Sequence, residues 1–213
     1  MINDSKTDLR QIFRHHILLI DDVYRKDAEK IITAGILSLP EYENANEVMT
    51  YLSFGYEVDT FKICRTILED KKQLAVPKMS AEEQTMSACQ VDTLEHGLIP
   101  NRYGILEPEN GSHRKVDPFE IDLVIVPGIA FASDGTRLGR GGGHFDRFLA
   151  DIRPDALKVG ICFASQRADT LPSDPWDQPV DCIVTEKEIR RIKGRNNPAA
   201  CHSGSCYKIE TSH

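Results

Sequence analysis

Three short runs of apolar residues constrain the fold more than any other feature of this sequence. Residues 121–128, "IDLVIVPG", form a continuous apolar segment that ends in Pro-Gly, and residues 157–164, "LKVGICFA", and 181–186, "DCIVTE", resemble it. Runs of this length and composition are typical of parallel strands that are buried on both faces. We therefore predict a strand at each of the three segments.

Helical patterns alternate with these strands along the chain. Further strands are predicted at 47–53, 73–77 and 86–91, and helices at 5–20, 22–38, 57–70, 144–152 and, as a short helix, at "KEIRRIK", 187–193. This alternation predicts an α/β fold, a single domain with a mostly parallel central sheet flanked by helices. We place the domain at residues 1–193 and interpret the polar stretch 194–213 as a mobile tail.

Composition and charge exclude several classes of protein. The formal net charge of −7, with no basic block longer than "EIRRIKGR", argues against a nucleic-acid partner. No apolar run approaches the length of a membrane span, and the polar N-terminus lacks the features of a signal peptide, so we expect a cytoplasmic protein without a membrane partner. The six cysteines then indicate buried, reduced thiols. We interpret Cys201 and Cys206, beside His202 in the tail, as incidental rather than metal-binding.

The most unusual segment is "RLGRGGGHFDRFL", 137–149, which follows a buried strand and an Asp-Gly turn and leads into a helix. Glycines allow a ligand to approach main-chain N–H groups, and Arg137 and Arg140 add donors for phosphate oxygens. The segment matches neither the dinucleotide fingerprint nor the Walker A loop. An anion-binding loop at a helix start is favoured over a tight turn without ligand. Asp146, in the first helical turn, is either a helix-dipole residue or a Mg²⁺ ligand.

Five segments in order along residues 6–186 carry a resemblance to a known family: "KTDLR", "YLSFGYEVDT", "YGILEP", "DLVIVPGIAFASDGTRLGRGGGHFDRFL" and "LPSDPWDQPVD". Together they resemble the 5-formyltetrahydrofolate cyclo-ligases, which are also called methenyltetrahydrofolate synthetases. The resemblance implies a fold of the NagB/RpiA-like type, and we expect a monomer. The long, ordered match is much more specific than a glycine triplet alone.

The resemblance implies an ATP- and Mg²⁺-dependent enzyme with a small-molecule substrate, 5-formyltetrahydrofolate, with or without a polyglutamate tail. The formyl oxygen would attack the γ-phosphate of ATP, N10 would attack the activated carbon, and 5,10-methenyltetrahydrofolate, ADP and phosphate would result. Such chemistry depends on positioning and charge neutralisation. Two alternatives stay open: a divergent relative that binds folate or nucleotide without turnover, and a sensor of phosphorylated metabolites on the same scaffold.

The same resemblance assigns roles to individual residues. Those implied to contact ATP are Lys6, Arg10, Arg137, Leu138, Gly139, Arg140, Gly141, Gly142, Gly143, His144 and Phe145. Those implied to contact the folate are Arg10, Leu52 and Glu57, and the implied Mg²⁺ ligands are Asp146 and Asp177. Arg140 and Glu57 are the implied catalytic residues. Without the resemblance, Lys6 and Arg10 would be interpreted as solvated surface, and Glu57 as a carboxylate at a helix start.

Three positions depart from the family pattern. His144-Phe145 stands where the family usually has Tyr-Tyr, so Phe145 keeps the aromatic face but loses a hydroxyl donor, and only His144 can replace a hydrogen bond. Gly142 replaces a lysine found in some members, and Trp176 replaces the usual histidine before Asp177. These departures put the rate or the substrate range in question more than the fold. His144 either replaces one hydrogen bond of the missing tyrosine or is a packed or capping histidine.

Overall fold

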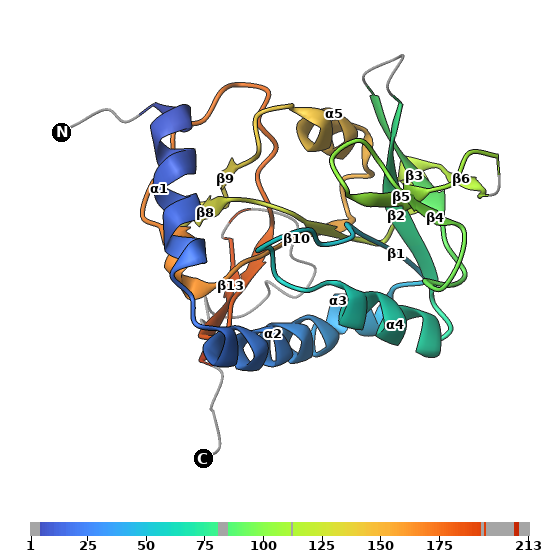
Figure 1. Ribbon diagram of the computed structural model, residues 1–213, viewed down its shortest axis with the longest axis horizontal. Helices are drawn as coiled ribbons and strands as arrows, with labels where there is room; N and C mark the ends of the chain where they lie inside the picture. The colour runs from blue at the N-terminus through green and yellow to red at the C-terminus, as the bar shows by residue number, and fades with distance from the viewer. Residues whose placement is uncertain (1–4, 81–84, 112, 193, 195–206, 209–213) are drawn as a thin grey trace.

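The computed structural model describes residues 5–80, 85–111, 113–192, 194 and 207–208. Its centre is a nine-stranded sheet with the order β14-β13-β12-β10-β7-β1-β2-β3-β6 (Figure 1). The strands are β1 (Glu47–Thr50), β2 (Gln73–Ser80), β3 (Thr85–Gln90), β6 (Lys115–Val116), β7 (Leu123–Val126), β10 (Leu157–Ile161), β12 (Cys182–Val184), β13 (Glu188–Arg191) and β14 (Tyr207–Lys208). The five inner strands, from β12 to β2, pair in parallel. The outer strands pair antiparallel on both sides.

Helices cover both faces of the sheet and make three layers. In Figure 1, α2 (Asp22–Leu37), α3 (Pro40–Asn44) and α4 (Phe61–Glu69) lie below the sheet, and α5 (His144–Asp151) lies above it. Side chains of β7 alternate between two cores: Leu123 and Ile125 pack with α2 and α4, whereas Val124 and Val126 pack with α5. This alternation is the period-two pattern of a strand buried on both faces. The α/β fold predicted from the apolar runs is confirmed.

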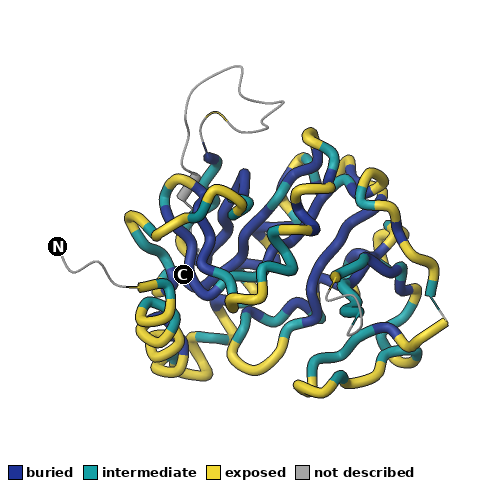
Figure 2. Tube along the Cα trace, turned by 90° about the horizontal axis from the view of Figure 1, so that it is seen from above, coloured by how far each residue is buried: buried dark blue, intermediate teal, exposed yellow. Residues whose placement is uncertain are grey.

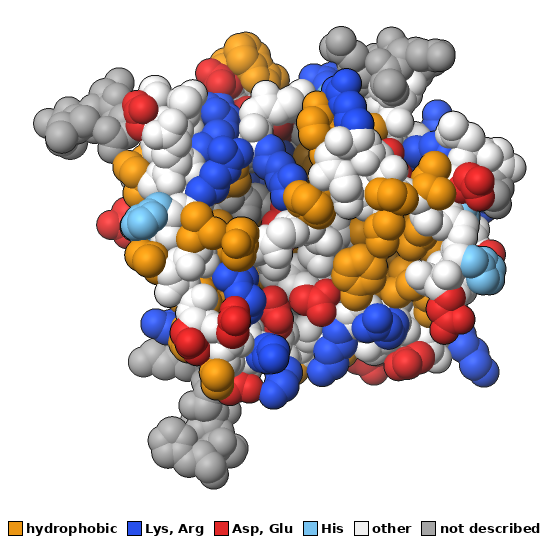
Figure 3. Space-filling view, in the orientation of Figure 1, with side chains coloured by type: hydrophobic (Ala, Val, Ile, Leu, Met, Phe, Trp, Pro, Cys, Tyr) orange, Lys and Arg blue, Asp and Glu red, His pale blue; other side chains and the backbone are white. Residues whose placement is uncertain are grey.

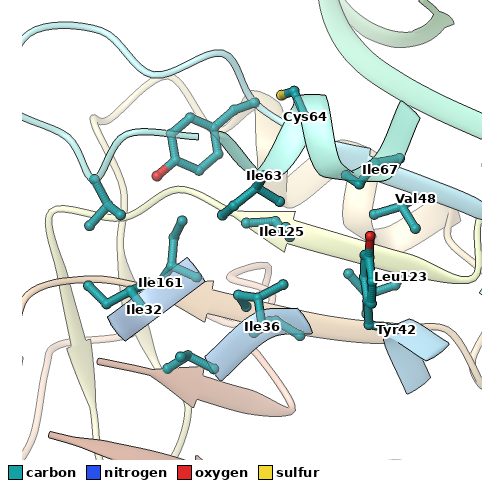
Figure 4. Close-up of a cluster of buried hydrophobic side chains, with 14 of the residues drawn as sticks. Ile32, Ile36, Tyr42, Val48, Ile63, Cys64, Ile67, Leu123, Ile125 and Ile161 are labelled. Carbon is teal, nitrogen blue, oxygen red and sulfur yellow. The ribbon is translucent and has the colours of Figure 1, made fainter. Parts of the chain in front are cut away.

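The larger core lies between the sheet and the α2–α4 layer. Ile32 and Ile36 of α2 and Ile63 and Ile67 of α4 have no solvent exposure (Figure 4). Figure 2 shows buried positions concentrated along the strands in the middle of the molecule, with exposed positions on loops and outer helix faces. Burying branched aliphatic side chains stabilises the fold by about 2 kcal/mol for each side chain.

Two smaller sheets and α1 (Lys6–Leu18) complete the structure. One sheet has the order β11-β8-β9, formed by β11 (Arg167–Ala168), β8 (Ala130–Ala132) and β9 (Arg137–Leu138). The other pairs β4 (Leu98–Pro100) with β5 (Leu106–Pro108). Short 3₁₀ helices η1 (Pro118–Glu120) and η2 (Ala164–Gln166) connect strands. Phe13 of α1 packs against Ile129 and Leu138, so α1 is fixed beside β8 and β9.

The short helix predicted at 187–193 is wrong. Residues Glu188–Arg191 form β13, which pairs antiparallel with β12 through Val184 and Ile189. The helix predicted from residue 57 begins at Phe61, because the Asp59 carboxylate accepts a hydrogen bond from the Phe61 amide and ends the preceding loop there. A pattern of charged residues with Ile189 and Ile192 favours a helix locally, but pairing with the edge of the sheet overrides that preference.

The remaining expectations for the chain have mixed outcomes. Cys64, Cys89, Cys162 and Cys182 are buried free thiols, as predicted. Burial raises the pKa of Cys64 and of Cys182 to about 12. Cys201, His202 and Cys206 lie outside the described residues. Within the predicted tail, Tyr207–Lys208 forms β14 against β13. No described helix combines the length and the hydropathy that crossing a membrane requires.

Candidate active site

The glycine segment lies between a strand and a helix, as predicted, but its loop is shorter. Arg137 and Leu138 belong to β9, the loop is Gly139–Gly143, and His144 and Phe145 form the first turn of α5. Gly141 and Gly143 have φ values of 107° and 64°, in the region that favours glycine. Gly143 is the N-cap of α5, so the loop delivers the chain directly to a helix N-terminus, where backbone amides favour anions.

Arg137 is fixed beneath this loop by directional contacts. The guanidinium donates to the Pro127 carbonyl at 3.1 Å and to Asp146 Oδ1 at 2.6 Å, and it lies 5.9 Å from the centre of the Phe145 ring. Its side chain is 4% exposed, and its Nε has no hydrogen-bond partner among the described residues. The Gln178 amide also donates to Asp146 Oδ1, at 3.1 Å. Arg137 thus joins the end of β7 to the first turn of α5.

Lys6 makes the second ion-pair cluster of the site. Its ammonium lies 2.6 Å from Asp174 Oδ2 and 2.6 Å from Asp177 Oδ2, and the Asp174 amide donates to Asp177 Oδ2 at 2.8 Å. Partial burial alone would lower the pKa of Lys6, but hydrogen bonds to the two carboxylates outweigh it and raise that pKa. Partial burial would likewise raise the pKa of Asp177, but the Asp174 amide, Lys6 and Arg137 lower it below its ordinary value.

The first helix also touches the glycine loop. Arg10 lies one helical turn after Lys6, and its Nε donates to the Gly139 carbonyl at 2.8 Å. A capping box at Ser5 and Asp8 begins α1 immediately before these residues and fixes where the helix starts. Both cations therefore face the site instead of extending into solvent as the alternative interpretation required. Figure 3 shows Lys and Arg side chains gathered beside α1, where the surface is hollowed.

Arg140 links the loop to the segment after β1. Its Nη2 lies 2.6 Å from Glu57 Oε1, while Glu57 Oε2 accepts a hydrogen bond from the Phe54 amide at 3.0 Å. The Arg140 side chain is half exposed, so the pair is accessible from solvent. The structure therefore brings together the two residues that the resemblance implies are catalytic, one from the implied phosphate loop and one from the implied folate pocket.

His144 and Arg147 form a local pair at the start of α5. Arg147 Nη2 lies 2.9 Å from His144 Nδ1 and 3.3 Å from the Gly142 carbonyl oxygen. Because a guanidinium only donates, His144 Nδ1 accepts in this arrangement, and Nε2 carries the imidazole proton. The Nε2 edge of the ring lies against Gly142. The ring therefore presents its N–H group at the glycine loop.

Two of the implied contact residues turn their side chains into the core. Leu138 is 1% exposed and packs with Phe13 and Ile129. Leu52 is 4% exposed and belongs to the core beneath the sheet. Only main-chain groups of Leu138 are then available to a ligand, and Leu52 acts at most as part of a pocket wall. Trp176 is 67% exposed and lies at the surface beside Asp177.

The carboxylates are suited to a shared Mg²⁺ ion. Within the described part of the chain, Asp146 accepts hydrogen bonds through Oδ1 and Asp177 through Oδ2, so the second oxygen of each carboxylate is available to a metal ion. The amide of Gln178, the neighbour of Asp177, binds Asp146, which places the two acidic segments in contact. No group of three metal-ligating side chains occurs in the described part of the chain. Mg²⁺ commonly binds one or two carboxylates together with phosphate oxygens and water, and this donor set fits that arrangement.

Three further residues of the site were not found from the sequence. Asp174 shares Lys6 with Asp177, Gln178 binds Asp146 through its amide, and Arg147 contacts His144. The spacing "DPWD" places two carboxylates three positions apart and offers a signal for Asp174. The contact of Gln178 uses only its main chain, so its residue type gives no signal.

The sequence model of the 5-formyltetrahydrofolate cyclo-ligase family matches residues 2–186. The chain belongs to this family. It is similar to a probable 5-formyltetrahydrofolate cyclo-ligase of Schizosaccharomyces pombe, with 31% identity over 203 residues that cover 88% of this chain and 98% of that protein. It is also similar to the mitochondrial 5-formyltetrahydrofolate cyclo-ligase of Arabidopsis thaliana, with 30% identity, 90% of this chain and 77% of that protein. The cytoplasmic location expected for this chain stays a prediction.

Solved structures of cyclo-ligase relatives have the same fold. The 5,10-methenyltetrahydrofolate synthetase of Aquifex aeolicus superimposes with a TM-score of 0.78 at 33% identity, covering 92% of this chain and 98% of that one. The synthetase of Mycoplasma pneumoniae superimposes with a TM-score of 0.70 over 86% of this chain and all of that one, and at 20% identity it supports the fold alone. The family resemblance found in the motifs is confirmed, whereas the residue roles and the monomeric state stay predictions.

Proposed function

We propose that this cyclo-ligase family member converts 5-formyltetrahydrofolate to 5,10-methenyltetrahydrofolate with consumption of MgATP. The observation that carries the proposal is the Arg140–Glu57 contact of 2.6 Å, which joins the glycine loop to the segment implied to bind the folate. A reaction between the γ-phosphate of ATP and the formyl oxygen of the folate requires that both substrates bind side by side in one site. Positioning of this kind supplies much of the rate acceleration in phosphoryl transfer.

The nucleotide is proposed to bind across the glycine loop. Backbone N–H groups of Gly139–Gly143 and the start of α5 face its phosphates, with Arg140 and Arg10 as charge-assisted donors. Lys6 and Arg137 are now paired with carboxylates. When MgATP binds, these cations would turn to phosphate oxygens, and the carboxylates of Asp146 and Asp177 would hold the metal. Mg²⁺ would neutralise charge on the phosphates during the transfer.

The folate is proposed to lie against the segment that follows β1. Glu57 accepts hydrogen bonds from the pterin or the formyl region, and its position is fixed by the Phe54 amide as well as by Arg140. The formyl oxygen forms a bond to the γ-phosphorus as ADP leaves. N10 then forms a bond to the formyl carbon and gives up its proton, the bond between that carbon and the phosphate oxygen breaks, and hydrogen phosphate departs from the closed five-membered ring.

The test follows product formation directly. Purified protein is incubated with 5-formyltetrahydrofolate and MgATP, and the absorbance of methenyltetrahydrofolate is followed beside ADP release. The expected result is ring closure that requires ATP, with one ADP released for each product formed. The variant Asp146→Asn is expected to lose turnover, whereas Asp27→Asn, at an exposed carboxylate, keeps it. Nucleotide binding without product in the wild-type protein would overturn the proposal and favour the binding-only relative.

A further inference from the structure

A cavity lies at the end of the sheet opposite to the glycine loop. Its volume is about 440 Å³, within the range of small-molecule sites. It is formed where β1 and β2 begin and where Asp122 precedes β7. The residues proposed to bind nucleotide and folate lie instead on segments beyond the carboxyl ends of the parallel strands and on α1, which contacts the glycine loop. This cavity is therefore separate from the candidate active site.

Two arginines line the cavity, and each already has a carboxylate partner. Arg153 pairs with Asp122, whose other oxygen accepts the Asn46 and Glu47 amides at 2.6 and 2.9 Å. Arg114 Nη1 lies 3.0 Å from Glu120 Oε2, and its Nε donates to Gln90 Oε1 at 2.8 Å. Both guanidinium groups of the cavity therefore already donate to acceptors within the protein.

Glu47 is the carboxylate of this cavity that has no hydrogen-bonded cation among the described residues. It is 4% exposed, and Arg114 Nη2 approaches its Oε2 only to 3.6 Å. Its Oε1 is buried and has no hydrogen-bond partner in the described part of the chain. Burial raises the pKa of Glu47 to about 7; Arg114 opposes this rise, and Glu120 and Asp122 add to it. A buried acceptor without a donor is costly, and the site gains free energy when a donor arrives.

The same cavity has an apolar wall beside its charged groups. The side chain of Phe119, in η1, lines it, and the residue is 66% exposed. An exposed aromatic ring gains free energy when an apolar group covers it and removes its surface from water. Three carboxylates and two guanidinium groups around the cavity leave one negative charge when Glu47 is ionised. The arrangement is complementary to a single positive charge that carries an apolar group.

We propose that this cavity binds a small organic monocation with N–H donors, a primary ammonium or a guanidinium group, with Glu47 as its counter-ion and the Phe119 ring against its apolar part. The ligand donates to Glu47 Oε1, the buried oxygen without a hydrogen-bond partner among the described residues, and the half-exposed Arg114 side chain, 3.6 Å from Oε2, adjusts to admit it. A metal ion is a poorer fit, because Asp122 and Glu120 are already paired with arginines.

The test uses methylguanidinium chloride as the probe, with binding measured by isothermal titration calorimetry at pH 8. Saturable binding is expected to the wild-type protein, and it should weaken at least about tenfold in Glu47→Gln, since a charged hydrogen bond is lost. Glu43→Gln is the matched control, because Glu43 is exposed and the substitution removes the same charge four positions earlier. Binding should also weaken from pH 8 to pH 5.5, as Glu47 takes up a proton.

Two comparisons make the outcome decisive. Tetramethylammonium chloride carries the charge without N–H donors and should bind much more weakly, and sodium chloride at the same concentration should give no saturable signal. Circular dichroism and thermal unfolding establish that Glu47→Gln is folded. Absence of saturable binding to the wild type, equal affinity in Glu47→Gln, or equal affinity for tetramethylammonium would overturn the proposal. The result is independent of cyclo-ligase activity, because no residue of the candidate active site is changed.

Discussion

The ammonium of Lys6 lies 2.6 Å from a carboxylate oxygen of Asp177, although 171 positions separate the two residues in the chain. The Arg137–Asp146 contact, also 2.6 Å, repeats the arrangement, with a residue implied to bind phosphate paired to one implied to bind Mg²⁺. Each charge thus already has a partner of opposite sign before ligands bind. If MgATP binds as proposed, it would exchange the partners of four charges at once, and we expect Mg²⁺ and nucleotide to bind cooperatively.

Lys6→Met is expected to weaken ATP binding by roughly tenfold, because one charge-assisted contact to phosphate is lost. The dissociation constant of a fluorescent ATP analogue, measured with saturating Mg²⁺, checks this. Lys30→Met is the matched control, since Lys30 is exposed and its one ion pair with a described residue is that with Asp27 at the surface. Equal affinities for the two variants would contradict the assignment of Lys6 to the nucleotide site.

Arg137→Met is expected to lower the free energy of unfolding by about 3 kcal/mol, because it leaves a largely buried carboxylate without its cation. The Asp146 side chain is 17% exposed and, among the described residues, would keep only the hydrogen bond from the Gln178 amide. Arg140→Met, at a side chain that is 49% exposed, should cost less than about 1 kcal/mol. Urea unfolding of both variants measures the difference. Similar losses of unfolding free energy would show that the burial of Arg137 does not determine its contribution to stability.

Arg140→Ala is expected to weaken ATP binding by roughly tenfold and folate binding by roughly threefold or less. Glu57 keeps its hydrogen bond from the Phe54 amide in this variant, so the folate side of the pair stays in place. Glu57→Gln should show the opposite order, with the larger loss for folate. Separate calorimetric titrations with ATP and with the folate test whether each variant loses more affinity for a different ligand. The same order of losses in both variants would argue against separate roles for the two residues.

Gly142→Ala is expected to displace the imidazole of His144 and to weaken nucleotide binding by roughly fivefold. A Cβ at position 142 would lie 2.7 Å from His144 Cδ2 and 2.9 Å from Nε2, so the ring must shift, which disturbs its 2.9 Å contact with Arg147. In a His144→Ala background the added methyl group meets no ring and should have little effect. A double-mutant cycle measures this coupling, and additive losses would mean that the His144 ring has no part in the loop's geometry.

Glu47→Gln is expected to stabilise the protein at pH 8 and to have little effect near pH 4. The folded pKa of about 7 exceeds the reference value of 4.5, so the folded state binds more protons between these pH values. The free energy of unfolding therefore falls as pH rises from 4.5 to 7, and the penalty persists above 7. The stability penalty from ionised Glu47 is at most about 3 kcal/mol. Urea unfolding at both pH values tests the sign, and a pH-independent difference would contradict it.

Local sequence was sufficient for most of the elements. The buried strand β7, the glycine loop and α5 follow from an apolar run, clustered glycines and an amphipathic segment, and each depends on neighbouring residues. The helix predicted at 187–193 failed because β12 offers Ile189 and its neighbours a sheet edge, which the segment's own charges and apolar spacing do not reveal. The small sheet of β8, β9 and β11 was also missed. Its strands are two or three residues long, too short to show a period-two pattern in the sequence.

The sequence by itself determined the family, the α/β fold and the residue types that gather at the glycine loop. Only the tertiary structure decided which charge meets which: Lys6 with Asp174 and Asp177, Arg137 with Asp146, Arg140 with Glu57. It also decided that Leu138 and Leu52 point into the core. The physical reason is that backbone preferences and apolar periodicity act over a few neighbouring residues. Ion pairs between distant segments exist only after the sheet has assembled and brought the ends of its strands to a common edge.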